Sequence, residues 1–221
     1  MNSFIKRALT IIVASTMSVS FAACKGGENN VRIGSTYNTL KILQDDMNYP
    51  DLGQKLSISM AKGETEGAQL IVTPQKNVAS YSIEVSDLTG EGGATISKDN
   101  VEIFVQKYLE VKAKSNKQNN TDYQPGWYPD MLLPIDLARD QGEDTIEGGK
   151  NQAFTVEVST TSETEAGDYI GTLTLELDGK TETLPLSVTV WDIDITQSYG
   201  QTSFNWFLSG MMMGETEFTY D

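Results

Sequence analysis

The sequence predicts an all-β fold, an antiparallel β-sandwich that is immunoglobulin-like or jelly-roll-like, over residues 31–196. Three observations favour it. Short segments rich in Val, Ile, Thr and Leu alternate apolar with polar residues, as half-buried strands do. Turn residues, among them many of the 19 glycines, separate these segments. Few segments show helical periodicity. About eight strands at such spacing are typical of a sandwich.

The first half of the body contains five extended segments. They are VRIGSTYNTLKIL (31–43), KLSISMA (55–61), AQLIVTP (68–74), YSIEVSDL (81–88) and NVEIFVQKYLEVKA (100–113). The acidic turn GETEG (63–67) predicts that the second and third segments form a hairpin. The glycine-rich GEGG (90–93) should break the chain after the fourth segment.

The second half begins with two segments that lack the alternating pattern of a strand. The polar stretch 114–122 should be a loop, and the stretch 123–140, with three prolines and no regular period, should wrap over the body as an irregular segment. The closing strands are QAFTVEVST (152–160), DYIGTLTLELDG (168–179) and KTETLPLSVTVWDIDI (180–195).

Two local sequence features of the closing strands predict backbone geometry. Asp178-Gly179 predicts a tight hairpin turn, because both residues tolerate a positive φ. Gly171 interrupts an otherwise regular strand. It predicts either the close approach of a neighbouring strand or ring, or a bulge.

The N-terminus has the form of a secretory signal. Lys6 and Arg7 precede an apolar run, and the small residues Ala22 and Ala23 directly precede the only cysteine, Cys24. This arrangement resembles a bacterial lipobox, although a Phe stands where such boxes usually carry Leu. We therefore expect 1–23 to be a lipoprotein signal peptide. Lipid on Cys24 would tether the chain to the membrane outside the cytoplasm, at the bacterial cell surface.

A polar linker over residues 24–30 would then lead to the sandwich. The alternative for the N-terminus is an ordinary signal peptide that is cleaved nearby and leaves Cys24 unpaired.

Composition excludes several functions. The formal net charge is -15, with 16 basic and 31 acidic residues, so the surface should repel nucleic acid. Histidine is absent, which removes the Ser-His-Asp and Cys-His systems and every His-based metal site. We expect no catalytic residues, no metal and no cofactor in this chain.

Carboxylate pairs are the remaining candidates for glycosidase chemistry, which needs two carboxyls at a fixed separation around a sugar. The pairs are Asp45/Asp46, Glu143/Asp144 and Asp192/Asp194. For each pair the simpler interpretation is an acid exposed to solvent. Calcium binding by Glu143 and Asp144 is chemically possible, but no EF-hand-like spacing supports it.

Three aromatic residues are the possible carbohydrate contacts. Tyr123, Trp127 and Tyr128 lie in the proline-rich stretch, and sugars stack on aromatic faces. Exposed rings there could form the wall of a sugar subsite. The alternative is that they anchor this stretch to the sandwich or to a following domain.

Several separated motifs, taken together and in order, carry a family resemblance. They are LSISMAKGETEGAQLIVTP (56–74), the aromatic-Pro-Asp-x-Leu-Leu-Pro pattern of GWYPDMLLP (126–134), GGKNQAFTVEV (148–158) and ETEAGDYIGTLTL (163–175). This pattern resembles the N-terminal β-sandwich of bacterial proteins related to glycoside hydrolase family 123, including the group described by domain of unknown function 4091. The resemblance covers residues 31–195.

The resemblance implies a two-part architecture in which a β-sandwich precedes a catalytic (β/α) barrel. Characterised members are β-N-acetylgalactosaminidases that use an adjacent Asp-Glu pair of the barrel and the acetamido group of the substrate. No position here matches that pair. The segment 197–221, which includes Phe204 and Trp206, resembles a linker and the first strand of a truncated barrel.

The resemblance therefore implies a non-catalytic module, inactive alone, that supports the barrel of a lipid-anchored hydrolase acting on N-acetylhexosamine glycans. Its glycan partner would be bound through the parent enzyme. The alternatives are a stand-alone carbohydrate-binding module and a structural or adhesion spacer.

Overall fold

The structure is a computed structural model that describes residues 30–112 and 125–196. The expected signal peptide, Cys24 and the expected barrel strand within 197–221 lie outside these residues. In the part of the chain that is described, no helix has the length and hydrophobicity needed to span a bilayer.

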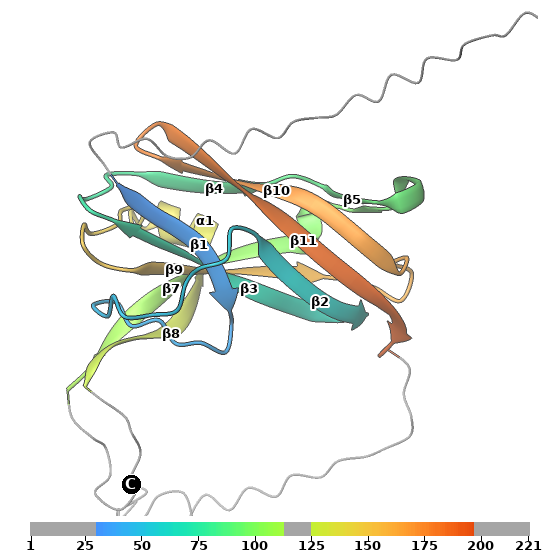
Figure 1. The fold of residues 1–221 in the computed structure, drawn as a ribbon, viewed down its shortest axis with the longest axis horizontal. Helices are drawn as coiled ribbons and strands as arrows, with labels where there is room; N and C mark the ends of the chain where they lie inside the picture. The colour runs from blue at the N-terminus through green and yellow to red at the C-terminus, as the bar shows by residue number, and fades with distance from the viewer. Residues whose placement is uncertain (1–29, 113–124, 197–221) are drawn as a thin grey trace, which may run out of the picture.

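Two β-sheets stack face to face and form a sandwich, so the predicted all-β class is confirmed (Figure 1). The first sheet, which we call sheet A, has five strands in the spatial order β1 (Val31–Tyr37), β3 (Thr65–Pro74), β9 (Gln152–Ser159), β7 (Val101–Val111) and β8 (Gly126–Pro134).

The second sheet, sheet B, has six strands. Five follow the order β2 (Leu56–Lys62), β11 (Lys180–Asp194), β10 (Gly167–Leu177), β5 (Leu88–Gly90) and β6 (Thr95–Ile96), and β4 (Tyr81–Val85) pairs with β10 beyond the end of β5. The helical elements of the described residues are short: η1 (Glu91–Gly93), η2 (Lys98–Asn100) and α1 (Ile135–Asp140).

The main hydrophobic core lies between the two sheets. Alternate residues of each strand point into it, as the period of two requires. Leu70 and Phe154 from sheet A and Leu173 and Leu186 from sheet B are completely buried. The rings of Tyr81 and Phe154 meet edge to face across the core, with centroids 5.2 Å apart. This interleaved apolar layer holds the sheets together.

The predicted hairpin between the second and third strands is wrong. β2 belongs to sheet B and β3 to sheet A, so the 63–67 turn carries the chain across the sandwich. Gly63 adopts a positive φ of 78° at this crossing, a conformation that glycine adopts readily. The carboxylate of Glu64 accepts the Ala61 N–H at 2.6 Å, which fixes the corner. As a consequence β2 pairs parallel with β11, the single parallel pair in sheets that are otherwise antiparallel over the described residues.

The prediction of an irregular segment over 123–140 is also wrong for most of its length. Residues 126–134 form strand β8, which pairs antiparallel with β7 and is followed directly by α1. β8 is the edge strand of sheet A, and proline is tolerated at an edge because no further strand needs its N–H. The register shifts between Lys107 and Tyr108, where Pro129 stands opposite Tyr108.

Both predictions for the closing strands, the tight turn and the close approach at Gly171, are confirmed. Asp178 and Gly179 have φ values of 48° and 77°, and they close a two-residue hairpin between β10 and β11. At Gly171 a Cβ atom would lie 3.0 Å from the Leu88 side chain and 3.3 Å from the Asp87 carbonyl oxygen. A Cβ atom would thus make tight contacts here, which confirms the predicted close approach, and the β10–β11 register shows no bulge at this residue.

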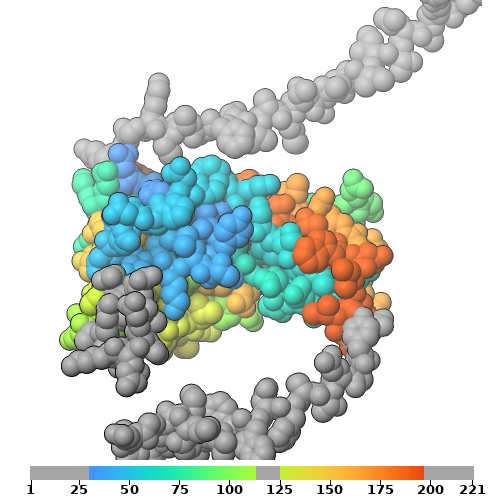
Figure 2. All heavy atoms as spheres, turned by 60° about the horizontal axis from the view of Figure 1, so that its bottom comes forward, coloured from blue at the N-terminus to red at the C-terminus, as the bar shows by residue number. Residues whose placement is uncertain are grey.

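Residues 38–55, between β1 and β2, lie against the outer face of sheet A; we call them the covering loop. Its Ile42 is buried together with Ile71 of β3 and Ala153 of β9 in a second, smaller apolar cluster. Partly buried side chains pack around this cluster; they are Leu40, Tyr49, Leu52 and Tyr108. In Figure 2 the covering loop, drawn in blue to cyan, spreads over one side of the sandwich. Sheet A is thus covered on both faces.

Candidate functional site

The predicted carbohydrate-contact rings do not form one wall in the described residues. Tyr123 lies outside them, and the other two rings follow each other on β8. Trp127 stands opposite Glu110, and Tyr128 stands opposite Leu109. Neighbouring residues of a strand point to opposite faces of the sheet, so Trp127 and Tyr128 face away from each other. A carbohydrate contact at either ring stays a prediction.

The covering loop is held by two side-chain amides, one from β3 of sheet A and one from the residue directly before β9. Gln69 and Asn151 are both 1% exposed, and each donates two hydrogen bonds to main-chain oxygens. The acceptors are the carbonyl oxygens of Tyr37 and Leu40 for Gln69, at 2.6 and 2.7 Å, and of Leu43 and Asp46 for Asn151, at 2.8 and 2.7 Å. These bonds satisfy backbone groups that would otherwise be buried without partners.

A pocket of about 210 Å³ lies where the covering loop, β8 and the outer face of sheet A meet; we call it the outer-face pocket. Its lining is polar at the sheet and mixed at the rim. The lining residues are Asn38, Leu40, Lys41, Gln69, Gln106, Pro129, Asp130, Leu132, Thr155 and Glu157. Of these residues, only Pro129, Asp130 and Leu132 of β8 lie in the proline-rich stretch 123–140, where the sequence predicted possible carbohydrate contacts.

A short hydrogen-bonded chain links three of the lining side chains. The Gln106 Nε2 group donates to Gln69 Oε1 at 3.1 Å and to Thr155 Oγ1 at 2.9 Å. All three side chains are more than nine-tenths buried. Buried polar groups of this kind fix each other's orientation, so the polar surface that they present is preorganised.

An acidic residue stands at the edge of this pocket. Burial raises the pKa of Glu157, and the charges of Glu102 and Glu66 raise it further. Glu102 lies directly opposite Glu157 on β7, and Glu66 lies on the other neighbouring strand, β3. The carboxylates along this edge disfavour an anionic ligand beside them, while Lys41 is the basic residue in the lining.

A larger hollow of about 490 Å³ lies at the edge of the sandwich between β4, β7 and α1; we call it the edge groove. Apolar residues such as Ile83 and Phe104 alternate in its lining with charged residues such as Glu84 and Lys98. Arg139 and Asp136 form an ion pair of 3.3 Å on α1 beside it.

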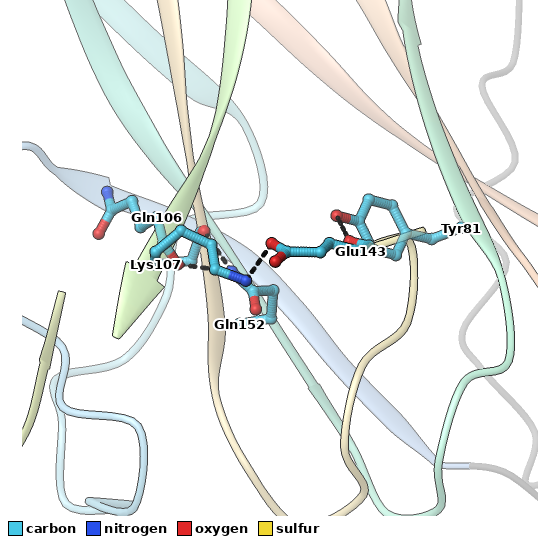
Figure 3. A network of polar contacts seen from close by, with 6 residues as sticks. Tyr81, Gln106, Lys107, Glu143 and Gln152 are labelled. Carbon is cyan, nitrogen blue, oxygen red and sulfur yellow. Dashed lines mark hydrogen bonds and ion pairs between the residues drawn. The ribbon is translucent and has the colours of Figure 1, made fainter. Parts of the chain in front are cut away.

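A polar network beside α1 ties three strands to the loop that follows the helix (Figure 3). Lys107 Nζ makes an ion pair with the carboxylate of Glu143, and the Tyr81 hydroxyl donates to the Glu143 carbonyl oxygen at 3.2 Å. Burial first, and then the charge of Asp144, raises the pKa of Tyr81 to about 12. Glu143 is thus engaged in holding the fold.

The other predicted carboxylate pairs have local partners as well. Asp192 forms an ion pair with Lys62 at 2.7 Å, and the hydrogen bond from Lys62 lowers the pKa of Asp192. Asp194 accepts hydrogen bonds from the backbone and hydroxyl of Thr196. Among the described residues, no group of three or more Asp, Glu, Cys or His side chains is arranged to hold a metal ion.

Sequence reasoning missed the polar residues that build the outer-face pocket. A signal was present, because Gln69 and Thr155 each interrupt an apolar run in a strand. An isolated polar residue in such a run needs a hydrogen-bond partner once it is buried. Which partner it finds depends on the neighbouring strand and the covering loop, and neither follows from the local sequence.

The fold and these sites define a β-sandwich module with a polar pocket on one face and an open groove at one edge. The sequence matches the family model of the Glycoside hydrolase 123 N-terminal domain over residues 41–177, and the chain belongs to this family. The resemblance seen in the sequence motifs is thereby confirmed. No curated protein matches the chain in sequence.

Solved structures support the fold. A family 123 glycoside hydrolase from Clostridium perfringens, described in connection with glycolipid glycan hydrolysis, is similar with a TM-score of 0.58 and 17% sequence identity. The match covers 74% of this chain but only 27% of that enzyme. At this identity the likeness shows the fold alone.

Two fimbrial proteins match more weakly. The major subunit of Myf fimbriae from Yersinia enterocolitica has 10% identity and a TM-score of 0.33, and the match covers 73% of this chain and 98% of that one. The CooA pilin subunit from enterotoxigenic Escherichia coli has 12% identity and a TM-score of 0.35, with the same coverage of both chains. Scores at this level carry no functional argument.

Proposed function

We propose that the chain is the non-catalytic N-terminal module of a lipid-anchored glycoside hydrolase that acts on N-acetylhexosamine-containing glycans. The observation that carries the proposal is membership of the Glycoside hydrolase 123 N-terminal domain family. The chain spans about a quarter of the family 123 enzyme that it resembles, and the proposal assigns the hydrolytic machinery to a part of the parent protein outside this match.

A supporting role for the module is consistent with how β11 leaves the sandwich. The Ile195 N–H donates to the Lys62 carbonyl oxygen at 3.1 Å, so β11 stays attached to β2 up to its end. Nearby, Trp191, Ile193 and Ile195 are 49%, 55% and 49% exposed. Exposed apolar side chains gathered in this way favour contact with another part of a protein. A firmly attached end of β11 with exposed apolar side chains is suited to a module that packs against the domain after it and supports that domain.

The proposal is tested first by the intact mass of the native protein extracted from its own cell membrane. A mass well above that of the 221-residue chain supports a following catalytic domain. A mass equal to that of the processed chain plus lipid contradicts it. In the same preparation, radiolabelled fatty acid should enter the wild type and not Cys24→Ser, and equal labelling of both would refute the lipid anchor.

The non-catalytic part of the proposal has its own test. The purified 221-residue chain should release no sugar from an aryl N-acetyl-β-galactosaminide, while the longer native protein should release it. Hydrolysis by the short chain would contradict the assignment, because it would place the reacting carboxyls within this sequence.

A stand-alone carbohydrate-binding module is the second candidate, and one observation favours it. Trp127 is 36% exposed on the outer face of sheet A, two residues from Pro129 of the outer-face pocket. Quenching of tryptophan fluorescence by amino-sugar glycans in the wild type but not in Trp127→Phe would support binding at this ring. Trp191→Phe is the matched control at the opposite sheet.

A further inference from the structure

We propose that the outer-face pocket is a binding site for one unit of a neutral sugar, which it holds through a free acceptor on Gln106 and a free donor on Thr155. This inference does not rest on the proposed function, since it concerns the described sandwich alone. It follows from the orientation of the amides, the chemistry of the rim and the size of the pocket.

The orientation of the amides is fixed by the covering loop. Gln69 Nε2 faces two carbonyl oxygens, those of Tyr37 and Leu40, so it must be the amino group of that side chain. The Oε1 atom of Gln69 is then an acceptor, and Gln106 must present its own amino group to it. Thr155 Oγ1 accepts the other N–H of Gln106.

Two hydrogen-bonding positions remain after these assignments. Gln106 Oε1 has no partner among the described residues, and the same holds for the hydroxyl proton of Thr155. The Tyr108 hydroxyl is the only fully buried side-chain polar atom left without a partner in the described part of the chain. Gln106 Oε1 is therefore reachable from outside the protein. Figure 3 shows the Gln106 amide extending in the direction opposite to Lys107.

A free acceptor beside a free donor matches the hydroxyl groups of a sugar. Each hydroxyl can donate one hydrogen bond and accept others, so one hydroxyl, or two neighbouring ones, can satisfy both positions. Leu40, Leu132 and Pro129 supply the apolar wall against which the ring carbons would lie. Small-molecule sites combine apolar walls with a few placed polar groups in this way.

The charges at the rim select a neutral ligand. Asp130 and Glu157 outnumber Lys41 around the opening, and Glu102 adds negative charge on the neighbouring strand. An anionic sugar such as a uronate would be repelled. The volume of about 210 Å³ is below the roughly 300–1,000 Å³ of sites for drug-sized ligands, so a single sugar unit is the appropriate size.

The test uses the whole chain and nuclear magnetic resonance of its side-chain amides. Galactose, N-acetylgalactosamine and galacturonate are titrated separately while the Gln106 and Gln69 amide signals are followed. We expect saturable shifts with one or both neutral sugars and at least about tenfold weaker binding of the anion. Absence of a saturable shift with all three, or equal binding of the anion, overturns the proposal.

Two pairs of variants separate binding from folding. Thr155→Val removes the donor and should weaken binding about tenfold or more, while Thr155→Ser keeps the hydroxyl and should bind within about threefold of the wild type. Leu132→Trp should block the pocket from β8, whereas Met131→Trp, on the adjacent residue that faces the other way, should not.

Thermal unfolding of each variant shows whether it is folded, and Thr183→Val at an exposed position of β11 in sheet B is the neutral control. Unchanged binding in both Thr155→Val and Leu132→Trp would overturn the proposal, and so would loss of binding in Met131→Trp alone. Failure of this test leaves the assignment of the chain to a glycoside hydrolase untouched, because that assignment depends on the native mass and on hydrolysis.

Discussion

The outer faces of the two sheets differ in how they meet solvent. In sheet B, β10 alternates buried and exposed residues, and its outer Ile170 is 61% exposed. In sheet A, five consecutive residues of β3, from Ala68 to Val72, are buried, and so are four of β9, from Ala153 to Val156. The difference is the covering loop, which closes the outer face of sheet A alone.

This comparison shows how a polar pocket arises in a small sandwich. A sheet with one solvated face needs no buried polar side chains, because water satisfies that face. A face covered by a loop buries the main-chain groups of the loop, which then require donors and acceptors from the sheet. Gln69 and Asn151 supply these groups. Gln69 also accepts a hydrogen bond from Gln106, and these two side chains line the outer-face pocket together with Thr155.

The largest effect is expected in the core that both sheets share. Phe154→Ala removes a fully buried ring that contacts Tyr81 across the sandwich, and it should lower the free energy of unfolding by about 3–5 kcal/mol. Denaturant unfolding measures this loss. Thr172→Ala on the exposed face of β10 should change stability by less than about 0.5 kcal/mol, and a similar loss in both variants would contradict the assigned core.

The next effect separates the two outer faces directly. Ile71→Ala should cost about 2–5 kcal/mol, because Ile71 is buried under the covering loop. Ile170→Ala makes the same chemical change on the open face and should cost less than about 0.5 kcal/mol. Equal losses, measured in the same denaturant series, would mean that the loop does not cover sheet A in solution.

A smaller effect is expected from the polar anchor of the loop. Gln69→Leu keeps a similar volume but removes the donors to Tyr37 and Leu40, and should cost about 1–3 kcal/mol. Hydrogen exchange should accelerate at the Gln44 N–H, which bonds to the Trp127 carbonyl oxygen.

The exposed Gln75 provides the control for this anchor. Gln75→Leu should leave both stability and exchange in the covering loop unchanged. Unaltered exchange at Gln44 in Gln69→Leu would show that the amide does not hold the loop.

The smallest effect concerns the acidic edge of sheet A. Because the pKa of Glu157 is raised by burial and by Glu102 and Glu66, its ionised form costs stability at neutral pH. Glu157→Gln should therefore stabilise the chain at pH 7 by less than about 1 kcal/mol, since solvent screens a partly exposed group.

This gain should shrink as the pH falls through the raised pKa and vanish below the ordinary value of about 4.3, where the carboxyl is neutral in both states. Chemical unfolding at pH 7 and at pH 3.5 measures the difference. A gain that persists or grows in acid would contradict the direction of the shift.

The sequence predicted features that depend on neighbours along the chain. The Asp178-Gly179 turn requires only two residues that accept a positive φ, and both are adjacent. The alternation of β10 reports its buried face directly, and Gly171 indicated a close contact. The family motifs added the resemblance to the glycoside hydrolase 123 N-terminal domain, and the match over residues 41–177 confirmed it.

Other features escaped the sequence because they depend on partners far along the chain. The sequences of β2 and β11 do not indicate that these two strands pair in parallel. The sequence of the 63–67 turn likewise does not indicate that it connects the two sheets. The prolines of 126–134 concealed β8, since proline is allowed only because this strand happens to lie at an edge.

The sequence by itself thus determined that this chain is a β-sandwich of the glycoside hydrolase 123 N-terminal type, because strand period, turn chemistry and motif order are local or linear properties. The tertiary structure alone decided which face is covered, where Trp127 and Tyr128 point, and that Gln69, Gln106 and Thr155 meet beneath the covering loop. The physical reason is that a buried polar side chain needs a hydrogen-bond partner, and strand order and loop packing decide which partner lies near it. Both depend on contacts between residues that are far apart in the sequence.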